Sequence, residues 1–329
     1  MTGRVYVYRI NNKLEYNKPS MAIPPHFRIA KTDNYYDCTC LLLESLNHSE
    51  QIMKNIKIPT NIKVIFSFKG IDFIAHKLKL TETFKKLHPD MVPLSFNLNT
   101  DMAHIERYLS RKKYRHVILK KNVQQQEGIH ITNNIDNIKS IRDEYVICQE
   151  LLQNPLTVSN HKINIRIYII VATYKGNTCF FRFNDGFIYY APLEWRMNVA
   201  DMDVNITSGL KDRSLYKTNP LTYQDLLLHL GEEKSMQLDR NIQDLSIAIK
   251  TCYSDLISRK NKQMPCVCTQ LLGCDVAPDN VFNVKLMEIN KGPDMRFKDE
   301  IDGRLKQMLT DDYHNLLFKK KISNRLIPL

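Results

Sequence analysis

The segment from Gln270 to Met295 constrains the fold of this chain more than any other segment. It contains two apolar runs separated by a polar turn at Ala277–Asn280, a pattern that predicts a β-hairpin. Asp275 lies near the end of the first run, and Glu288 and Asn290 lie two residues apart at the end of the second. Because side chains two residues apart leave a strand on the same face, the sequence predicts that these three polar groups lie close together.

The chemistry of this polar group favours a metal site. Carboxylates in apolar strands are costly to bury unless a cation meets them. Magnesium bound to nucleotide phosphates prefers hard oxygen ligands and takes only one or two protein carboxylates. Asp275, Glu288 and Asn290 are therefore the predicted metal ligands. The alternative is an ordinary hairpin whose acidic residues lie at its solvated ends.

Length and composition indicate a globular protein with an anionic partner. The chain has 329 residues, more than a usual single domain, with 43% hydrophobic and 25% charged residues. Its net charge of +12 favours phosphates, an acidic protein tail or nucleic acid. Arg166 interrupts the longest apolar candidate, Ile163–Tyr174, so no membrane span is expected. A monomer is expected.

The cysteines favour a reducing compartment. The chain has 8 cysteines, and its N-terminus lacks the apolar core of a signal peptide, so we expect reduced thiols in a cytoplasmic protein. Two pairs, Cys38/Cys40 and Cys266/Cys268, are each separated by a single residue. This spacing is closer than zinc knuckles use, so half-buried thiols are favoured over a zinc site.

The first half of the chain divides into two predicted subdomains. Residues 1–70 form an N-terminal α/β subdomain with strands at Arg4–Ile10 and Val64–Phe68 and a helix from Tyr35 to about Lys54. Residues 71–150 form a central subdomain that begins with a basic helical stretch. Its later elements are a loop at Pro93–Leu98, a helix at Asp101–Arg111 capped by Thr100, a strand at His116–Leu119, a helix near Asn133–Ile141 and a strand at Tyr145–Leu152.

Residues 151–329 form a third predicted subdomain, which is strand-rich up to Tyr190. A polar excursion over Glu194–Leu221 follows, and then a long helix at about Ser235–Arg259, in which apolar residues recur every three or four positions. The hairpin comes next, and the chain closes with a helix near Asp299–Phe318. Strands and helices mixed in this way predict an α+β fold, in which a ligand site often lies in the cleft between subdomains.

Three short segments supply polar groups for such a cleft. Lys120 ends a strand before a polar loop, where a lysine either contacts phosphate or is solvated. The next segment ends a strand before Asn154-Pro155, where the backbone either meets an adenine ring or only enters a turn. Its candidate residues are Gln149, Glu150 and Leu152. Thr207 belongs to a polar turn that is uninformative by itself.

A fourth segment carries a cationic stripe. Lys162, Asn164 and Arg166 alternate with isoleucines, so a strand presents the three polar side chains on one face and the isoleucines on the other. On so apolar a strand this stripe fits phosphate binding better than solvation.

The order of these motifs resembles that of the tubulin–tyrosine ligase-like family of ATP-grasp ligases, over about Ile71–Met295. The strand that ends at Lys120, with the loop that ends in Glu-Gly-Ile, looks like the family's phosphate-covering strand and loop. The run through the Gln hinge, Asn-Pro and Lys-x-Asn-x-Arg is similar to the family's Gln, Asn-Pro and Lys-Phe-Asp-Leu-Arg segment. The turn at Thr207 falls where the family has His-Leu-Thr-Asn, and the hairpin matches its closing magnesium signature.

This resemblance implies an ATP-grasp architecture and ATP-dependent carboxylate–amine ligation. A carboxylate attacks the γ-phosphate to give an acylphosphate, and an amine then displaces phosphate to form an amide. The implied magnesium ligands are Asp275, Glu288 and Asn290, and the implied catalytic residue is Arg166, which stabilises the transferred phosphoryl group. The residues implied to bind ATP are Lys120, Gln149, Glu150, Leu152, Lys162, Asn164 and Thr207. The implied substrates are a free amino acid, such as glutamate, glycine or tyrosine, and an acidic protein tail such as that of tubulin.

The chain departs from the family pattern at four positions. Gln126 stands where the phosphate-covering loop usually has its first glycine. Asn164 replaces the Asp of Lys-Phe-Asp-Leu-Arg, and Ser208 replaces the Asn of Leu-Thr-Asn. Tyr189 replaces an arginine that is usually tied to binding of the substrate amino acid. The metal end of the site is thus complete, whereas the acceptor end is altered.

The altered positions leave an alternative open. A catalytically weak nucleotide-binding protein that docks on acidic partners or microtubules also fits the departures, although intact Asp275, Glu288 and Asn290 argue against it. Nucleic-acid binding is disfavoured, because the sequence has no helix-turn-helix, zinc-finger or aromatic RNA-binding pattern.

Overall fold

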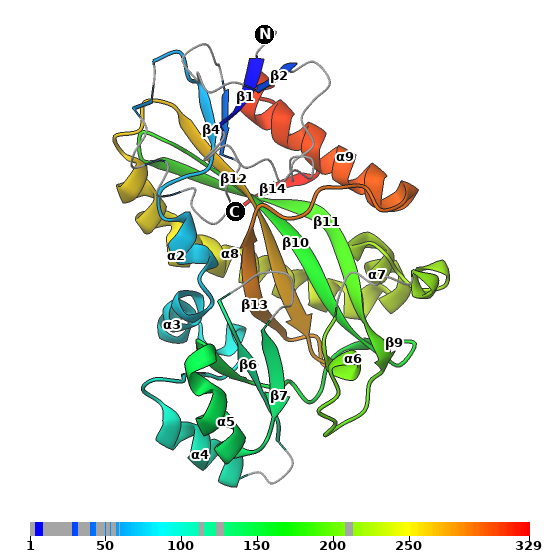
Figure 1. Cartoon of the computed structure of the whole chain (residues 1–329). Coiled ribbons are helices and arrows are strands. Elements are labelled where there is room, and N and C mark those ends of the chain that lie inside the picture. Colours follow the sequence, from blue (N-terminus) through cyan, green and yellow to red (C-terminus); the bar gives the residue numbers. More distant parts are fainter. Residues whose placement is uncertain are drawn as a thin grey trace.

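The computed structural model of the chain describes residues 4–8, 28–31, 40–43, 50, 53, 57–58, 60–111, 115–122, 128–207 and 213–329. Of the strands at 4–8, 28–31 and 40–43 only the backbone is described. The described residues form a mixed α/β structure that contains a large sheet and a small sheet (Figure 1).

The large sheet contains strands from both the N-terminal and the C-terminal part of the chain. Its strand order is β14-β11-β10-β12-β4-β3-β1-β2, with β13 paired to β12 and β9 paired to β10. Its strands are β1 (Arg4–Tyr8), β2 (Arg28–Lys31), β3 (Cys40–Leu43), β4 (Val64–Phe66), β9 (Thr157–Val158), β10 (His161–Tyr174), β11 (Asn177–Glu194), β12 (Val267–Pro278), β13 (Val284–Lys291) and β14 (Leu326–Pro328). The pairing of β4 with β12 is parallel, so strands of the predicted N-terminal piece continue the sheet of the C-terminal piece. The proposed division of the chain at residues 70 and 150 stays a prediction.

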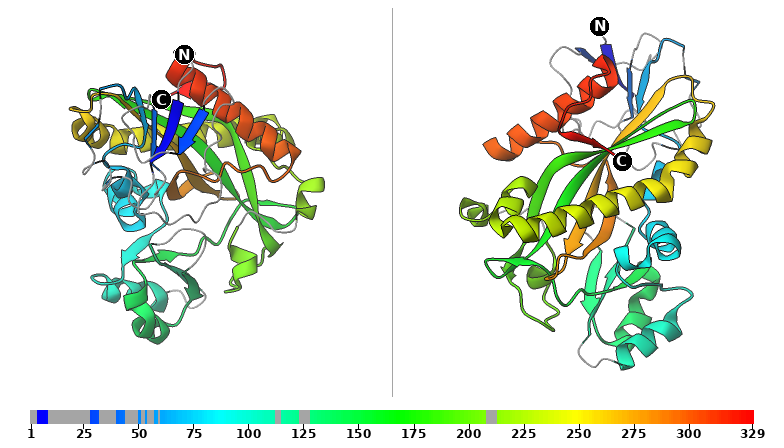
Figure 2. Two further views of the ribbon diagram at one scale, coloured as in Figure 1. Left: turned by 45° about the horizontal axis from the view of Figure 1, so that its top comes forward. Right: turned by 180° about the vertical axis from the view of Figure 1, so that it is seen from behind.

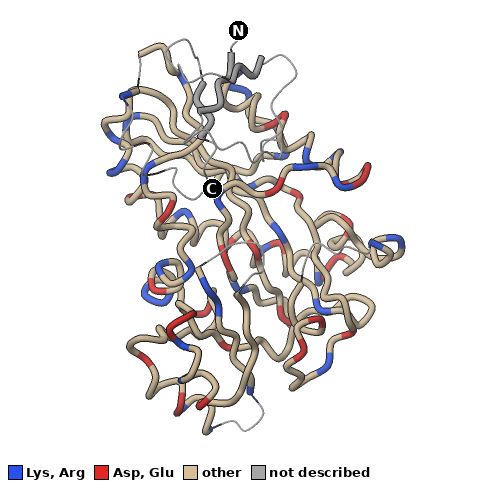
Figure 3. Tube along the Cα trace, viewed as in Figure 1, with Lys and Arg blue, Asp and Glu red and all other residues tan. Residues whose placement is uncertain are grey.

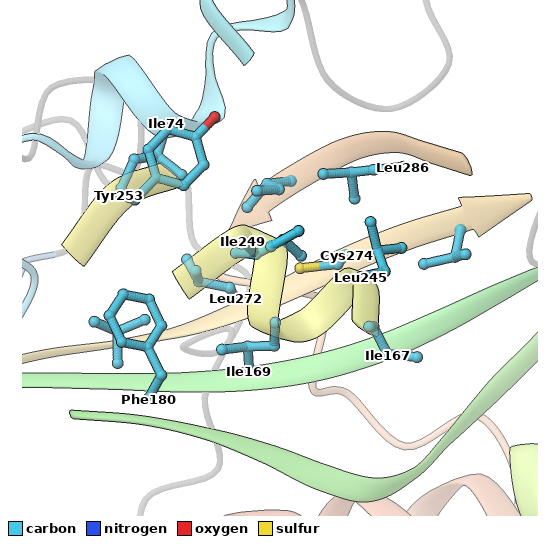
Figure 4. Packing of buried hydrophobic residues seen from close by; sticks show 14 of the residues in the cluster. Ile74, Ile167, Ile169, Phe180, Leu245, Ile249, Tyr253, Leu272, Cys274 and Leu286 are labelled. Carbon is cyan, nitrogen blue, oxygen red and sulfur yellow. The ribbon is translucent and has the colours of Figure 1, made fainter. Parts of the chain in front are cut away.

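One face of the large sheet is buried under a long helix, α8 (Glu232–Asn261), which lies behind the sheet in Figure 1 and crosses in front of it in the right view of Figure 2. The predicted apolar stripe of this helix is confirmed, because Leu245 and Ile249 are fully buried. They pack with residues of β10 and β12 such as Ile167 and Leu272, as Figure 4 shows. Each such side chain contributes about 1.5–3 kcal/mol when it leaves water, so this layer anchors β10 and β12 firmly.

The opposite face of the large sheet is covered at one end by α9 (Glu300–His314). Leu305 and Leu309 of this helix share a buried cluster with Tyr168 and Ile170 of β10. The polar residues of β10 lie on the same face but precede Tyr168, beyond this apolar cluster. The helix continues in a short π-helical segment, Asn315–Lys319, so the predicted terminal helix is confirmed in its main part.

The small sheet has the order β5-β8-β6-β7. Its strands are β5 (Ser95–Asn97), β6 (Val117–Lys120), β7 (Ile129–Thr132) and β8 (Ile147–Glu150), and α4 (Met102–Ser110) and α5 (Ile135–Ile141) pack on one face. Val117, Leu119 and Cys148 point toward these helices. The alternating residues Lys120 and Gln149 therefore point from the opposite face.

Several predicted elements of the first half were wrong in type. The expected helix from Tyr35 to about Lys54 contains a strand, β3, although Glu50 and Met53 are helical. The Cys-Leu-Leu-Leu run of β3 lies between β1 and β4, and a short apolar run of this kind cannot be assigned by periodicity alone. The expected loop at Pro93–Leu98 contains β5, which forms because its backbone pairs with β8.

The predicted cap of α4 was also wrong. The N-cap residue is Asp101 and not Thr100, and its side chain makes no capping hydrogen bond. Its carboxylate instead accepts a hydrogen bond from the Asn97 backbone amide at 2.9 Å. The interaction stabilises the turn between β5 and the helix.

Two helices from the region before the small sheet pack against the hairpin. They are α2 (Ile71–Ala75) and α3 (Lys77–Leu87). Asp72 of α2 forms an ion pair with Lys291, the last residue of β13. Lys77, the first residue of α3, reaches Glu288 of β13. The hairpin is thus contacted by residues that lie far from it in the sequence.

The polar excursion after β11 is partly helical. It contains α6 (Met202–Asn205) and a 3₁₀ turn at Ser214–Lys217, and residues 208–212, which include Ser208, lie outside the described residues. The next helix, α7 (Tyr223–Leu230), was not predicted from the sequence. Its start carries a capping box between Thr222 and Asp225, a signal that the sequence does contain.

Candidate active site

The predicted metal ligands lie together on the large sheet. Asp275 on β12 is directly opposite Glu288 on β13, and both side chains leave the same face. Asn290 Nδ2 donates hydrogen bonds to Glu288 Oε1 at 3.0 Å and to Asp275 Oδ2 at 3.3 Å. The register set by the turn pairs Val276 with Leu286, and a register shift at Met287 then brings Glu288, not Met287, opposite Asp275. The geometry agrees with the prediction, and the role of these residues as metal ligands stays a prediction.

Arg166 continues this row of residues onto a third strand. On β10 it is directly opposite Asp275, and its Nε and Nη2 both donate to the Asp275 carboxylate, the second at 2.9 Å. The guanidinium also lies over the ring of Tyr189 on β11, at 5.3 Å from the ring centroid. Arg166 therefore contacts the predicted metal site and the altered acceptor residue at once.

Half-buried cations lie beside the two carboxylates, Arg166 next to Asp275 and Lys77 next to Glu288. Burial raises the pKa of the Asp275 carboxyl to about 6, although Arg166 acts in the opposite direction. Glu288 is also subject to burial, but Lys77 and the Asn290 hydrogen bond lower its pKa. Figure 3 shows acidic and basic positions close together at the centre of the molecule. Two adjacent carboxylates and an amide, held by cations on both sides, form a donor set that fits a magnesium ion.

Two buried lysines form a second cationic group near these carboxylates. Lys120 comes from the free face of the small sheet and Lys162 from β10 of the large sheet, and each pKa is lowered to about 8, chiefly by burial. Each pKa is also influenced by a charge on the other sheet, that of Lys120 by Glu288 and that of Lys162 by Lys120. Lys120 Nζ donates to Gln149 Oε1 at 2.7 Å. Within the described part of the chain, no hydrogen bond or ion pair holds Lys162 Nζ.

Asn164 lies between the two cations of the stripe. Its Oδ1 is buried and has no hydrogen-bond partner among the described residues. A buried acceptor without a donor is costly, by about 1–3 kcal/mol. The position is therefore suited to receive a donor group from a ligand.

The other residues predicted to bind ATP are Glu150, Leu152 and Thr207. The Glu150 carboxylate accepts a hydrogen bond from the Leu94 amide at 2.9 Å, so its side chain is engaged at the edge of the small sheet. Leu152 is half-buried in the connection from β8 to β9. Thr207 is half-buried too, and its neighbour Ile206 packs against a buried cluster that includes Ile118 on the free face of the small sheet. Thr207 thus lies near this face.

Two further residues of the site, Lys77 and Gly273, were not predicted from the sequence. Lys77 Nζ lies 3.7 Å from Glu288 Oε2. Gly273 provides room for Arg166, because a Cβ at this glycine would lie 3.1 Å from Arg166 Cδ and 2.9 Å from Pro293 Cβ. Gly273 stands two residues before Asp275, and this spacing places it on the same strand face. The sequence contains no comparable signal for Lys77, whose approach depends on tertiary packing.

The described part of the chain contains neither a metal site built on cysteines nor a helix suited to cross a membrane. No group of three or more His, Cys, Asp or Glu residues in that part is arranged to hold a metal ion. Cys266 and Cys268 therefore belong to no such group. Cys38 lies outside the described residues, as does the side chain of Cys40. No helix in the same part combines the length and apolarity that crossing a membrane requires.

Comparison with known proteins decides the family. The model of the tubulin-tyrosine ligase family matches residues 53–324. The chain belongs to this family. Among its relatives, the tubulin polyglutamylase ttll-4 of Caenorhabditis briggsae is 22% identical over 247 residues, 69% of this chain and 40% of the relative. The tubulin polyglutamylase TTLL13 of Mus musculus is 23% identical over 302 residues, 79% of this chain and 37% of the relative.

A third relative in the tubulin-tyrosine ligase family carries a different name. The tubulin glycylase 3C of Tetrahymena thermophila is 24% identical over 215 residues, which cover 56% of this chain and 18% of the relative. The chain therefore spans about two fifths or less of the length of these curated relatives. The names of the relatives differ in the amino acid, so family membership leaves the substrate of this chain to be inferred.

Proposed function

We propose that this protein is an ATP- and magnesium-dependent ligase that attaches an amino acid to a carboxylate of a protein, with tubulin as the candidate acceptor. The observation that carries this proposal is the row Arg166, Asp275 and Glu288 across three strands, bridged by Asn290. The names of the relatives support amino-acid addition to tubulin. An ATP-grasp architecture belongs to the same proposal, with subdomains at residues 1–70, 71–150 and 151–329.

The proposed reaction assigns separate tasks to the two cationic groups. Lys120 and Lys162 hold phosphate oxygens, because both are buried and neither has a carboxylate within ion-pair distance among the described residues. Arg166 lies beside the carboxylates, where its planar fork meets two oxygens of the transferred phosphoryl group. Magnesium bound by Asp275, Glu288 and Asn290 would neutralise the phosphates and align them.

The proposed reaction has two steps, and the charge of the protein favours an acidic protein as one substrate. In the first step a protein carboxylate attacks the γ-phosphate and ADP leaves, which gives an acylphosphate. In the second step an amine attacks the acyl carbon, phosphate leaves, and an amide bond forms. A chain with a net charge of +12 attracts an acidic protein tail, which supplies such carboxylates.

One experiment tests the proposal directly. The protein is incubated with ATP, magnesium and each labelled amino acid in turn, against purified tubulin and against a cell lysate. Labelled protein that requires both ATP and magnesium is the expected result, and its identity names both substrates. The absence of product with every amino acid would contradict the proposal.

A catalytically weak nucleotide-binding protein is the second candidate function. Two observations favour it, the neutral Asn164 and the uncharged Tyr189 at the acceptor end. Calorimetry separates the two candidates when it is combined with the labelling experiment. Tight magnesium-dependent ATP binding without any ligation product would support the weaker function.

The maximal rate is expected to depend on the geometry of Arg166 more than on its charge. Arg166→Lys keeps the charge but loses the planar fork that meets two oxygens. We expect a loss of about tenfold or more in kcat, with ATP affinity within about twofold of wild type. Steady-state rates together with calorimetry check this result. If affinity falls while kcat is preserved, Arg166 serves in nucleotide binding alone.

ATP affinity is expected to fall as the pH rises above about 8. The lowered pKa values of Lys120 and Lys162 mean that both side chains are charged below this pH and lose their protons above it. Since phosphate binds the charged form, we expect affinity to drop about tenfold or more between pH 7 and pH 9. Calorimetry across this range, with thermal melting to verify folding, measures the effect. A flat profile would remove these lysines from the phosphate site.

A further inference from the structure

Arg166 has two kinds of partner, and they respond differently to a cation. Its ion pair with Asp275 depends on the negative charge of that carboxylate. Its contact with the Tyr189 ring, at 5.3 Å from the centroid, depends on the aromatic face. A metal ion bound at Asp275 would compete with the guanidinium for the carboxylate oxygens that Arg166 now contacts. The aromatic contact is unaffected by this competition.

The sheet register explains how Tyr189 reaches Arg166. Phe187 is the residue directly opposite Arg166, and Tyr189 is directly opposite Asn164. Tyr189 is therefore a diagonal neighbour of Arg166 on the same face, and such neighbours lie within reach of aromatic and long side chains. On the other side of the arginine, Gly273 leaves room for the side chain to lie flat against β12.

The ring of Tyr189, and not its hydroxyl, makes this contact. Within the described residues no hydrogen bond joins the Tyr189 hydroxyl to another group. Burial raises the pKa of the phenol, so the side chain is neutral at physiological pH. An arginine side chain loses about 2 kcal/mol of rotamer entropy when it is fixed, so an aromatic face that holds it in advance reduces the cost of placing it at each turnover.

We propose that Tyr189 is a positioning residue, which holds the Arg166 guanidinium toward the reacting phosphoryl group once a metal ion has taken the Asp275 carboxylate. The inference rests on the proposed function. It assigns a task within this chain to a residue at which the chain departs from the family pattern. Tyr189 acts through Arg166 and needs no contact with substrate.

Substitutions at Tyr189 test this proposal, with the ligation reaction as the assay. Tyr189→Leu is expected to lower kcat about tenfold, with the KM for ATP within about twofold of wild type. Tyr189→Phe is expected to keep kcat within about threefold, because it retains the aromatic face. Tyr174→Leu is the matched control. Lys175 Nζ lies over the Tyr174 ring, also at 5.3 Å from the ring centroid, but Tyr174 is 44% exposed at the end of β10. Its loss is therefore expected to leave kcat unchanged.

A double substitution shows whether Tyr189 acts through Arg166. In an Arg166→Lys background, Tyr189→Leu is expected to lower kcat less than about threefold, because the side chain that Tyr189 positions is already lost. An undiminished effect in that background would overturn the proposal, and so would a Tyr189→Phe variant as slow as Tyr189→Leu. A wild-type protein without ligation activity would instead contradict the proposed function, and the inference would fall with it.

Discussion

Glu288→Gln is expected to abolish ATP turnover while it leaves the fold intact. The substitution removes one carboxylate charge and keeps the volume and the hydrogen-bonding shape of the side chain. Glu288 is directly opposite Asp275 and accepts a hydrogen bond from Asn290, so the loss weakens the whole proposed metal site. We expect turnover to fall at least about a hundredfold, which corresponds to ~2.7 kcal/mol in the barrier.

Phosphate release and thermal melting, measured together, check this prediction. Glu300→Gln is the matched control, because Glu300 is 87% exposed at the start of α9 and pairs only with Arg304 among the described residues. Both variants are expected to melt within a few degrees of wild type. If Glu288→Gln keeps activity within about threefold, or ~0.65 kcal/mol, the assignment of Glu288 as a metal ligand is wrong.

The hairpin at the centre of the site was predictable because its interactions are local. A short polar turn between two apolar runs pairs the strands, but the register shift at Met287 that brings Glu288 opposite Asp275 was not predicted. The stripe on β10 was predictable for the same reason. Its period of two, with buried Ile163 and Ile165 on the other face, fixes where Lys162 and Arg166 point.

The contacts that tertiary packing creates were not predictable. Lys77 lies far before the hairpin in the sequence. It reaches Glu288 only because α2 and α3 pack against β13. The strand β3 was misassigned as part of a helix because its apolar run has no periodicity of its own, and its neighbours β1 and β4 define it. In each case the residues that determine the contact or the strand lie elsewhere in the sequence.

The second large effect is expected at Lys162, where loss of the charge should stabilise the protein and weaken nucleotide binding. Burial lowers the pKa of Lys162 from 10.5 to about 8, and this difference corresponds to about 3 kcal/mol of lost stability. Since the folded-state pKa lies below the unfolded-state value, the penalty is fully present below pH 8. It is relieved as the pH rises from about 8 to 10.5.

Lys162→Met removes the charge and keeps an unbranched apolar side chain at the end of the buried stem. We expect the free energy of unfolding at pH 7 to rise by about 1–3 kcal/mol and the gain to shrink by pH 10. ATP affinity is expected to fall at least about tenfold, because a phosphate contact is lost. Denaturant unfolding at both pH values and calorimetry with ATP measure the two effects in the same samples.

Lys79→Met is the matched control for this experiment. Lys79 is 46% exposed on α3 and pairs with Glu82 at 3.0 Å, so its loss should change neither stability nor affinity by much. If Lys162→Met destabilises the protein, or leaves ATP affinity unchanged, the lysine supports the fold and not a ligand. The expected combination, higher stability with weaker ATP binding, has a direct physical cause. A buried cation without a protein partner persists at a cost in stability, and an anionic ligand offsets that cost when it binds.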